Sequence, residues 1–108
     1  MNGTYYVPVT LGGASPNLTI AGQVKNQDGT SIASVVDVLV RTVATLVTDG
    51  LIAVNTGTAQ VGAGTQNCWL KTTSAGAFSV TITSTLGTKV LVEIVPTPGE
   101  TLLVPLQF

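Results

Sequence analysis

The sequence predicts an all-β domain, built as an antiparallel β-sandwich. Thr and Val are its two commonest residues, and side chains branched at Cβ favour the pleated, half-buried surface of a sheet. Several short runs alternate apolar and polar residues with period two, and glycine-containing turns separate these runs. Together these features indicate strands that turn one face towards a core.

The clearest strand covers residues 77–84, where Phe78, Val80 and Ile82 alternate with Ser and Thr. Weaker forms of the same pattern predict strands at 18–25, 36–41, 66–72 and 90–95, the last with apolar residues on nearly both faces. In the Ig-like or prealbumin-like sandwich that we expect, the inward faces include Leu18, Ile20, Val24, Val36, Val38, Val40, Phe78, Val80, Ile82, Val90, Val92 and Ile94.

The middle of the chain is harder to interpret. Residues 45–48 and 51–55 flank Asp49-Gly50, which predicts a hairpin there, with a short helix over 42–54 as the alternative. Residues 56–65 are glycine-rich, polar and aperiodic, so we expect a long loop. These glycines lack the lysine and the βαβ context of a nucleotide-binding loop.

Both ends of the chain contain proline in strand-like runs. Proline cannot donate a ladder hydrogen bond, so the runs around Pro8 and Pro105 are expected at sheet edges or bulges. Residues 12–16 (Gly-Gly-Ala-Ser-Pro) suggest a hinge. We therefore predict an extended N-terminal arm at 1–16 and a single sandwich domain at 17–108.

Charge is unusually scarce in this chain. It has four Lys or Arg, five Asp or Glu and no His in 108 residues, or 8% charged, against about 25% in typical domains. Without histidine or clustered acids, the sequence predicts no catalytic residue, no metal and no cofactor. Scattered single cations give no footprint for nucleic acid or for a membrane surface. We expect a protein that is not an enzyme.

The start of the chain and its single cysteine bear on where the protein is made. Residues 1–8 have neither a basic nor an apolar stretch of a secretory signal, which predicts a product made in the host cytoplasm. Cys68 has no partner in the chain and no neighbouring base or cation. We expect it to be buried as a small hydrophobe.

A few polar residues could suggest chemistry, and each has a simpler interpretation. Asp37 and Glu93 lie on predicted strands and could meet across a sheet, but two solvated side chains are the plainer expectation. Asn26, Asp28 and Thr30 have the spacing that begins a calcium loop, yet the glutamate that closes such a loop is missing. We expect an ordinary turn at this segment.

The aromatic residues are the best candidates for binding. Trp69, Tyr5 and Tyr6 could form a stacking platform for a sugar, whereas a lone Trp in a small β domain more often lies in the core or in an interface. Tyr is enriched at interface centres, so the two tyrosines are expected to anchor the chain to a neighbouring subunit. The full candidate interface is Tyr5, Tyr6, Val7, Trp69 and Phe108.

Two segments resemble a known family. Residues 22–35 run from Gly-Gln-Val through an Asp-Gly turn to an Ile/Ala corner, and 36–40 form a Val-Asp-Val-Leu-Val strand. Residues 71–80 have Thr before a turn, Gly in it and Phe at the start of the next strand. Both resemble carboxypeptidase regulatory-like and prealbumin-like β-sandwich domains over about 18–95. The resemblance implies a mostly non-catalytic module, and it carries over no functional residue.

A second resemblance concerns composition and architecture. Small, charge-poor β-sandwiches with an extended end are similar to the head decoration, or cement, proteins of tailed phages. This resemblance implies a non-enzymatic virion protein that binds the major capsid protein or other virion subunits on the outside of a phage head, with homo-oligomers expected. The alternative is a carbohydrate-binding or adhesive module of a phage tail or cell surface.

Overall fold

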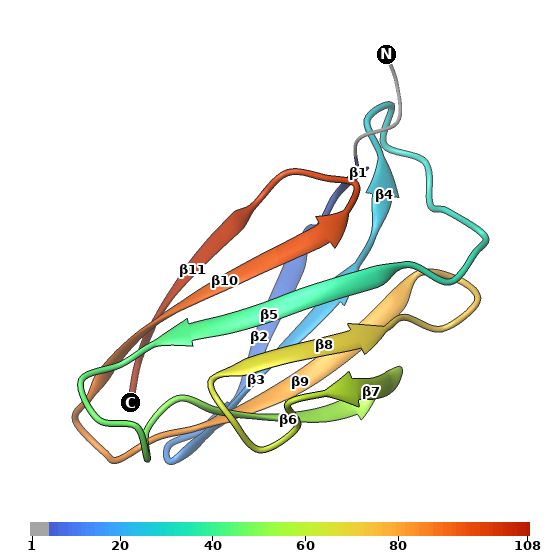
Figure 1. Cartoon of the computed structure of the whole chain (residues 1–108). Coiled ribbons are helices and arrows are strands. Elements are labelled where there is room, and N and C mark those ends of the chain that lie inside the picture. Colours follow the sequence, from blue (N-terminus) through green and yellow to red (C-terminus); the bar gives the residue numbers. More distant parts are fainter. Residues whose placement is uncertain (1–4) are drawn as a thin grey trace.

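The computed structural model describes residues 5–108 and shows two antiparallel sheets packed face to face (Figure 1). The five-stranded sheet has the order β11-β10-β5-β8-β7, and the four-stranded sheet has the order β2-β3-β9-β6. A two-stranded ribbon, β1 with β4, lies at one end of the sandwich. The all-β antiparallel sandwich that the sequence predicts is therefore confirmed.

Strands β3, β5, β8, β9 and β10 agree with the five strands predicted from the alternating pattern to within a few residues. In chain order the strands are β1 Tyr5–Tyr6, β2 Val9–Ala14, β3 Asn17–Gln23, β4 Lys25–Asn26, β5 Asp37–Val43, β6 Leu51–Thr56, β7 Thr58–Val61, β8 Asn67–Lys71, β9 Ala77–Thr83, β10 Lys89–Thr97 and β11 Leu102–Gln107.

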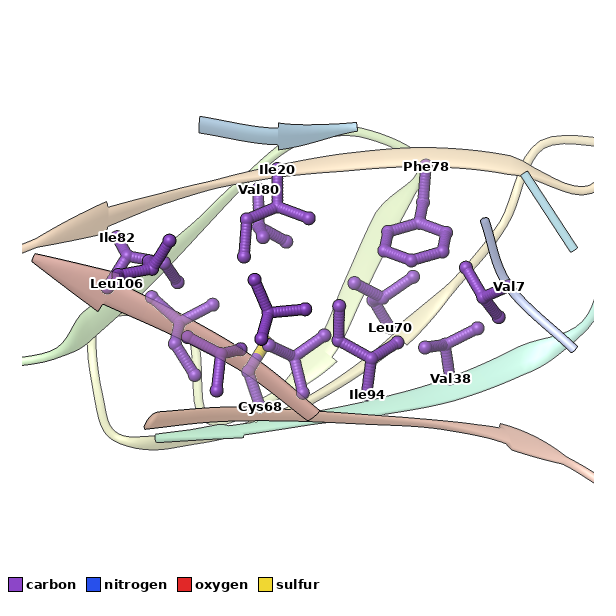
Figure 2. Packing of buried hydrophobic residues seen from close by; sticks show 14 of the residues in the cluster. Val7, Ile20, Val38, Cys68, Leu70, Phe78, Val80, Ile82, Ile94 and Leu106 are labelled. Atoms are coloured by element: carbon purple, nitrogen blue, oxygen red, sulfur yellow. The ribbon is translucent and has the colours of Figure 1, made fainter. Parts of the chain in front are cut away.

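The core lies between the two sheets. In Figure 2, Phe78 and Val80 of β9 project towards Leu70 of β8 and Ile94 of β10. Of the twelve residues predicted to face inwards, only Leu18 is partly exposed, and it still packs against the core. Cys68 is fully buried, as expected, and burial raises the pKa of its thiol.

The predicted N-terminal arm is wrong for residues 5–16. Strand β2 pairs with β3 along its whole length, from Val9 opposite Gly22 to Ala14 opposite Asn17. Strand β1 pairs with β4, and the backbone N–H of Tyr5 donates to the carbonyl of Pro98 at 3.0 Å. The sandwich therefore begins well before residue 17, and only residues 1–4 of the predicted arm lie outside the described part of the chain.

The middle of the chain also differs from expectation. Residues 45–48 form turns, so the Asp49-Gly50 hairpin is wrong, and the described residues contain no helix. The segment predicted as a loop, 56–65, contains strand β7. After β6 the chain leaves the four-stranded sheet, and β7 pairs with β8 at the edge of the five-stranded sheet. Gly57 permits this switch because its φ is +99° and an added Cβ would lie 2.6 Å from the carbonyl oxygen of Lys71.

The prediction that Pro105 lies at a sheet edge is confirmed. Pro105 lies in β11, which is an edge strand. Pro8 lies between β1 and the edge strand β2.

Candidate interaction surface

The five predicted interface residues do not form one surface. Val7 is 4% exposed and Phe108 is 5% exposed, so both belong to the core. Strand β1, which precedes Val7, and the C-terminus lie at opposite ends of the sandwich (Figure 1). Tyr5 and Tyr6 are partly buried in the short ribbon, and Tyr5 packs against the core. Val7 and Phe108 are thus wrong as interface residues, because both side chains pack in the core.

Trp69 lies on the outer face of the five-stranded sheet and is 40% exposed. Its neighbours in the strand, Cys68 and Leu70, are fully buried, so the Trp ring points away from the core. Trp69 lies opposite Leu39 of β5 and opposite Val61 of β7. Trp69 is therefore a surface aromatic and not a core residue.

A row of apolar side chains crosses this outer face. The pairing of four adjacent strands aligns Val95, Leu39, Trp69 and Val61 in one row perpendicular to the strands. Farther along the sheet, Pro105, Leu91 and Val43 align in a second row. We call this surface, made of the outward residues of β11, β10, β5, β8 and β7, the ion-paired face.

Two ion pairs flank the row that contains Trp69. The Nζ of Lys71 lies 2.7 Å from a carboxylate oxygen of Asp37, directly opposite on the neighbouring strand. A guanidinium nitrogen of Arg41 lies 2.7 Å from a carboxylate oxygen of Glu93, again directly opposite. Asp37 and Glu93 do not meet each other, and both side chains remain at the surface, as expected. Each also faces a cation across the ladder, which the sequence did not predict.

With Lys89, five of the chain's nine charged residues lie on the ion-paired face. Exposed pairs of this kind contribute little to stability, roughly 0–1 kcal/mol each. The ion pairs also act on strand register, because opposite charges directly across a ladder favour that register over one shifted by a residue. The face therefore presents an apolar centre between charges that are already neutralised.

The outer face of the other sheet has a different chemistry. Outward positions of β2, β3, β9 and β6 carry no charge and consist mainly of Thr, Ser, Ala, Gly and Asn. Some of these groups bond to one another: Thr83 donates to Asn17 at 2.8 Å, and Asn55 donates to Thr81 at 2.6 Å. The two broad faces of the sandwich are thus chemically distinct.

One end of the sandwich is also apolar. Leu46, Val47 and Leu86 are exposed in the loops at 44–50 and 84–88, close to the C-terminus (Figure 1). These loops are joined through Asp49, whose carboxylate accepts hydrogen bonds from the backbone N–H of Thr85 at 2.9 Å and from its hydroxyl at 2.7 Å.

Asp49 lies next to a turn glycine, yet it is only 2% exposed. The two bonds from Thr85 hold the pKa of the Asp49 carboxyl below its ordinary value. The anion therefore acts as a structural acceptor that fixes the apolar end.

A shallow groove adjoins the ion-paired face. It has a volume of about 470 Å³ and runs beside Val43, Leu91, Pro105 and Gln107, with Lys89 as the charged side chain in its wall. Its walls are mostly apolar, and it has no carboxylate or second polar side chain beyond Gln107 to orient a small ligand. The groove extends the apolar surface and does not form a distinct site.

The turn at residues 26–30 is an ordinary one, as predicted. Asp28 accepts hydrogen bonds from the backbone N–H of Thr30 at 3.0 Å and from its hydroxyl at 2.6 Å, and these bonds lower the pKa of the carboxyl. Among residues 5–108, no three His, Cys, Asp or Glu side chains gather where they could hold a metal ion. That part of the chain also contains no helix of the length and apolarity needed to cross a bilayer.

Sequence reasoning missed the apolar row and the two ion pairs. The signal for the apolar row was present, since Leu91 and Val95 make the strand at 90–95 apolar on both sides. The ion pairs had no such signal, because Arg41 and Glu93 are 52 residues apart. No protein-family model, no curated protein and no solved structure matches this chain.

Proposed function

We propose that this protein is a non-enzymatic structural component of a virion, which attaches to the outer surface of a phage head through the ion-paired face. The observation that carries this proposal is the position of Trp69 in an exposed apolar row between two neutralised ion pairs. The compositional resemblance to head decoration proteins supplies the class of partner, which is the major capsid protein or a neighbouring virion subunit.

The physical argument concerns the cost of covering this face. Protein interfaces have apolar centres, enriched in Trp and Arg, within a more polar rim. Burying an isolated charge is expensive, whereas Asp37 and Glu93 keep their cation partners when a neighbour covers them. The sheet face is also rigid, since it is built on paired strands and not on loops, so little conformational entropy is lost on binding.

Co-sedimentation with particles tests this proposal. Particles from a lysate of cells that express the gene together with its phage would be purified on a density gradient, and the chain would be quantified by mass spectrometry. Trp69→Ala should lower occupancy at least about tenfold, as expected for an interface hot spot. The matched control is Val35→Ala, which truncates another exposed apolar residue that lies outside the face, in the segment before β5.

Two results would contradict the proposal. A wild-type chain that stays in the supernatant would remove the virion assignment. Equal occupancy for the Trp69→Ala and wild-type chains would remove the ion-paired face as the attachment surface. Thermal unfolding of both variants must show that they fold like the wild type.

A carbohydrate-binding or adhesive module is the second candidate, favoured by the same exposed Trp ring. An aromatic ring on a flat sheet can stack on the apolar face of a sugar, and Lys71 and Asp37 flank it in the next row. A glycan array with wild-type and Trp69→Ala proteins separates the two functions. Loss of a specific glycan signal in the variant would favour the adhesive module, and an array without wild-type signal would favour the virion protein.

A further inference from the structure

The four edge strands of the sandwich differ in how far they could accept another strand. An exposed edge presents unpaired backbone N–H and C=O groups, and proteins usually block such edges with proline, charge, bulges or covering loops. In β11, the bond from the N–H of Phe108 to the carbonyl of Thr88 fixes the alternation of the ladder, so the backbone groups of Leu103, Pro105 and Gln107 point outwards. Pro105 therefore removes the middle donor of this edge.

Two more edges are blocked in other ways. Strand β7 has only four residues, and a register shift between Ala59 and Val61 interrupts its pairing. The edge of β6 is partly covered, because the N–H of Ile52 donates to Thr65 at 2.9 Å and its carbonyl accepts from Gly64 at 2.6 Å. Neither edge offers a straight run of free groups.

Strand β2 is the exception. The N–H of Gln23 donates to the carbonyl of Pro8, and that of Val24 donates to the carbonyl of Gly76. Both bonds set the same alternation: odd-numbered residues of β3 bond to β2, and even-numbered residues bond to β9. The backbone groups of Val9 and Leu11 consequently point away from β3, to the open side of the sheet.

The surroundings of β2 leave this edge accessible. Strand β2 contains no proline and no charged residue. Leu11 is 53% exposed although it lies on the same face as the buried Ile20, since the sheet ends there. A groove of about 340 Å³ lies beside it, lined by Leu11, Gly12, Gly13, Leu18, Pro105, Leu106 and Gln107.

We propose that two copies of this chain pair through β2, antiparallel and about a twofold axis at Thr10. In this register Val9 of each copy lies opposite Leu11 of the other, and both residues direct their free N–H and C=O groups at one another. Four new backbone hydrogen bonds result, and the two four-stranded sheets become one eight-stranded sheet.

A second copy fits this edge for three reasons. The run of free groups is self-complementary, because Val9 and Leu11 are both outward-bonding and are equidistant from Thr10. The edge carries no charge, so two copies do not repel each other. The side chains of Val9 and Leu11 of the second copy lie on the inward side of the extended sheet, and Val9, opposite Leu11, lies beside the groove that Leu11 lines. The dimer leaves the row with Trp69 and its two flanking ion pairs free, and it does not depend on the proposed function.

Disulfide trapping tests the proposed register directly. Thr10 opposite Thr10 would be a non-hydrogen-bonded pair, with Cα atoms about 4.5 Å apart, within the range that a disulfide spans. Thr10→Cys should therefore give a covalent dimer rapidly on mild oxidation. The matched control is Ala21→Cys, the exposed register partner of Thr10 on β3, whose equivalents would lie roughly 14 Å apart, or three strand spacings. Cys68 is buried and does not compete.

A second variant tests the backbone bonds. Light scattering on the wild type should show a concentration-dependent mass approaching that of a dimer. Leu11→Pro removes an N–H that points away from β3 and has no partner among residues 5–108, and it should weaken dimerisation at least about tenfold. Leu11→Ala keeps the N–H and should weaken dimerisation less. A monomeric wild type at high concentration, or equal crosslinking rates for Thr10→Cys and Ala21→Cys, would overturn the proposal. A dimer that persists unchanged in Leu11→Pro would do the same.

Discussion

Gly22 in β3 is the position where one added methyl group tests the packing of the core most sharply. A Cβ at this residue would lie 2.5 Å from Cζ and 2.6 Å from Cε1 of Phe78, and 3.0 Å from a methyl carbon of Val7. Phe78 is itself buried between the sheets (Figure 2). Since ordinary carbon contacts are about 3.5–4.0 Å, the ring must move by roughly 1 Å.

Overpacking of this kind costs about 1–3 kcal/mol, because a close-packed core has no room for the displaced ring. Gly22→Ala should lower the free energy of unfolding by that amount. For a domain of this length, each kcal/mol corresponds to about 4 °C in the midpoint of thermal unfolding.

Chemical denaturation of four proteins measures the effect: wild type, Gly22→Ala, Phe78→Leu and the double variant. Leu is smaller than Phe and leaves space for the methyl group, so Gly22→Ala should cost much less in the Phe78→Leu background. The difference is a coupling energy between the two residues. Gly12→Ala is the matched control, since its added Cβ meets only Thr19 Oγ1, at 3.0 Å on the exposed face. An unchanged stability of Gly22→Ala, or equal costs in both backgrounds, would refute the reasoning.

Three further predictions concern a buried anion, the surface Trp and the core. The hydrogen bonds from Thr85 lower the pKa of Asp49 below its ordinary 3.8, so the stability that they contribute is complete above that pH and is lost as the pH falls through the folded-state pKa. The difference in thermal midpoint between wild type and Asp49→Asn should therefore shrink on acidification. A difference that stays constant with pH would contradict this prediction. Trp69→Ala should lower the free energy of unfolding, measured with urea, by far less than the roughly 3–5 kcal/mol of a buried aromatic, because the ring is partly exposed. A loss of roughly 3–5 kcal/mol would indicate that the ring is buried in the core. Ile82→Ala should cost about 2–5 kcal/mol and Leu103→Ala about 0.5 kcal/mol or less, and similar values for the two would contradict the assigned faces.

Much of the strand structure could be predicted from the sequence, because a strand that is buried on one face alternates apolar and polar residues with period two. Phe78, Val80 and Ile82 show this pattern and are buried as expected. Strand β7 shows no such pattern, since all four of its residues are exposed at a sheet edge. Its existence depends on the switch at Gly57 and on pairing with β8, and neither is visible in a glycine-rich run.

The predicted N-terminal arm is the opposite case, because a segment that looks loose in the sequence is a paired strand in the structure. Gly12 and Gly13 are typical of a hinge, and Pro16 supports that interpretation, yet β2 is held by pairing with β3. Gly13 has a φ of +78°, and an added Cβ there would lie 2.6 Å from the carbonyl oxygen of Asn17. Glycine at this position serves a close approach of two strands in a hairpin and does not loosen the chain.

The exposure of Trp69 could be predicted because the residue alternates with Cys68 and Leu70 in a strand, whereas Val7 lies between two strands, where no such pattern indicates its burial. The charges could not be placed in the same way, because a period-two pattern assigns a residue to a face but does not name its neighbour on the next strand. Arg41 meets Glu93, and Asp37 meets Lys71, only because β5 lies between β10 and β8.

This arrangement of the strands also explains what the few charges of the chain do. Four of the charges are used in cross-strand pairs on one face, which favour the register of the strand between them, and the opposite sheet is left neutral to its edge at β2. A neutral edge can be joined by its own copy without electrostatic cost, while the paired charges on the other face can be covered without separating them.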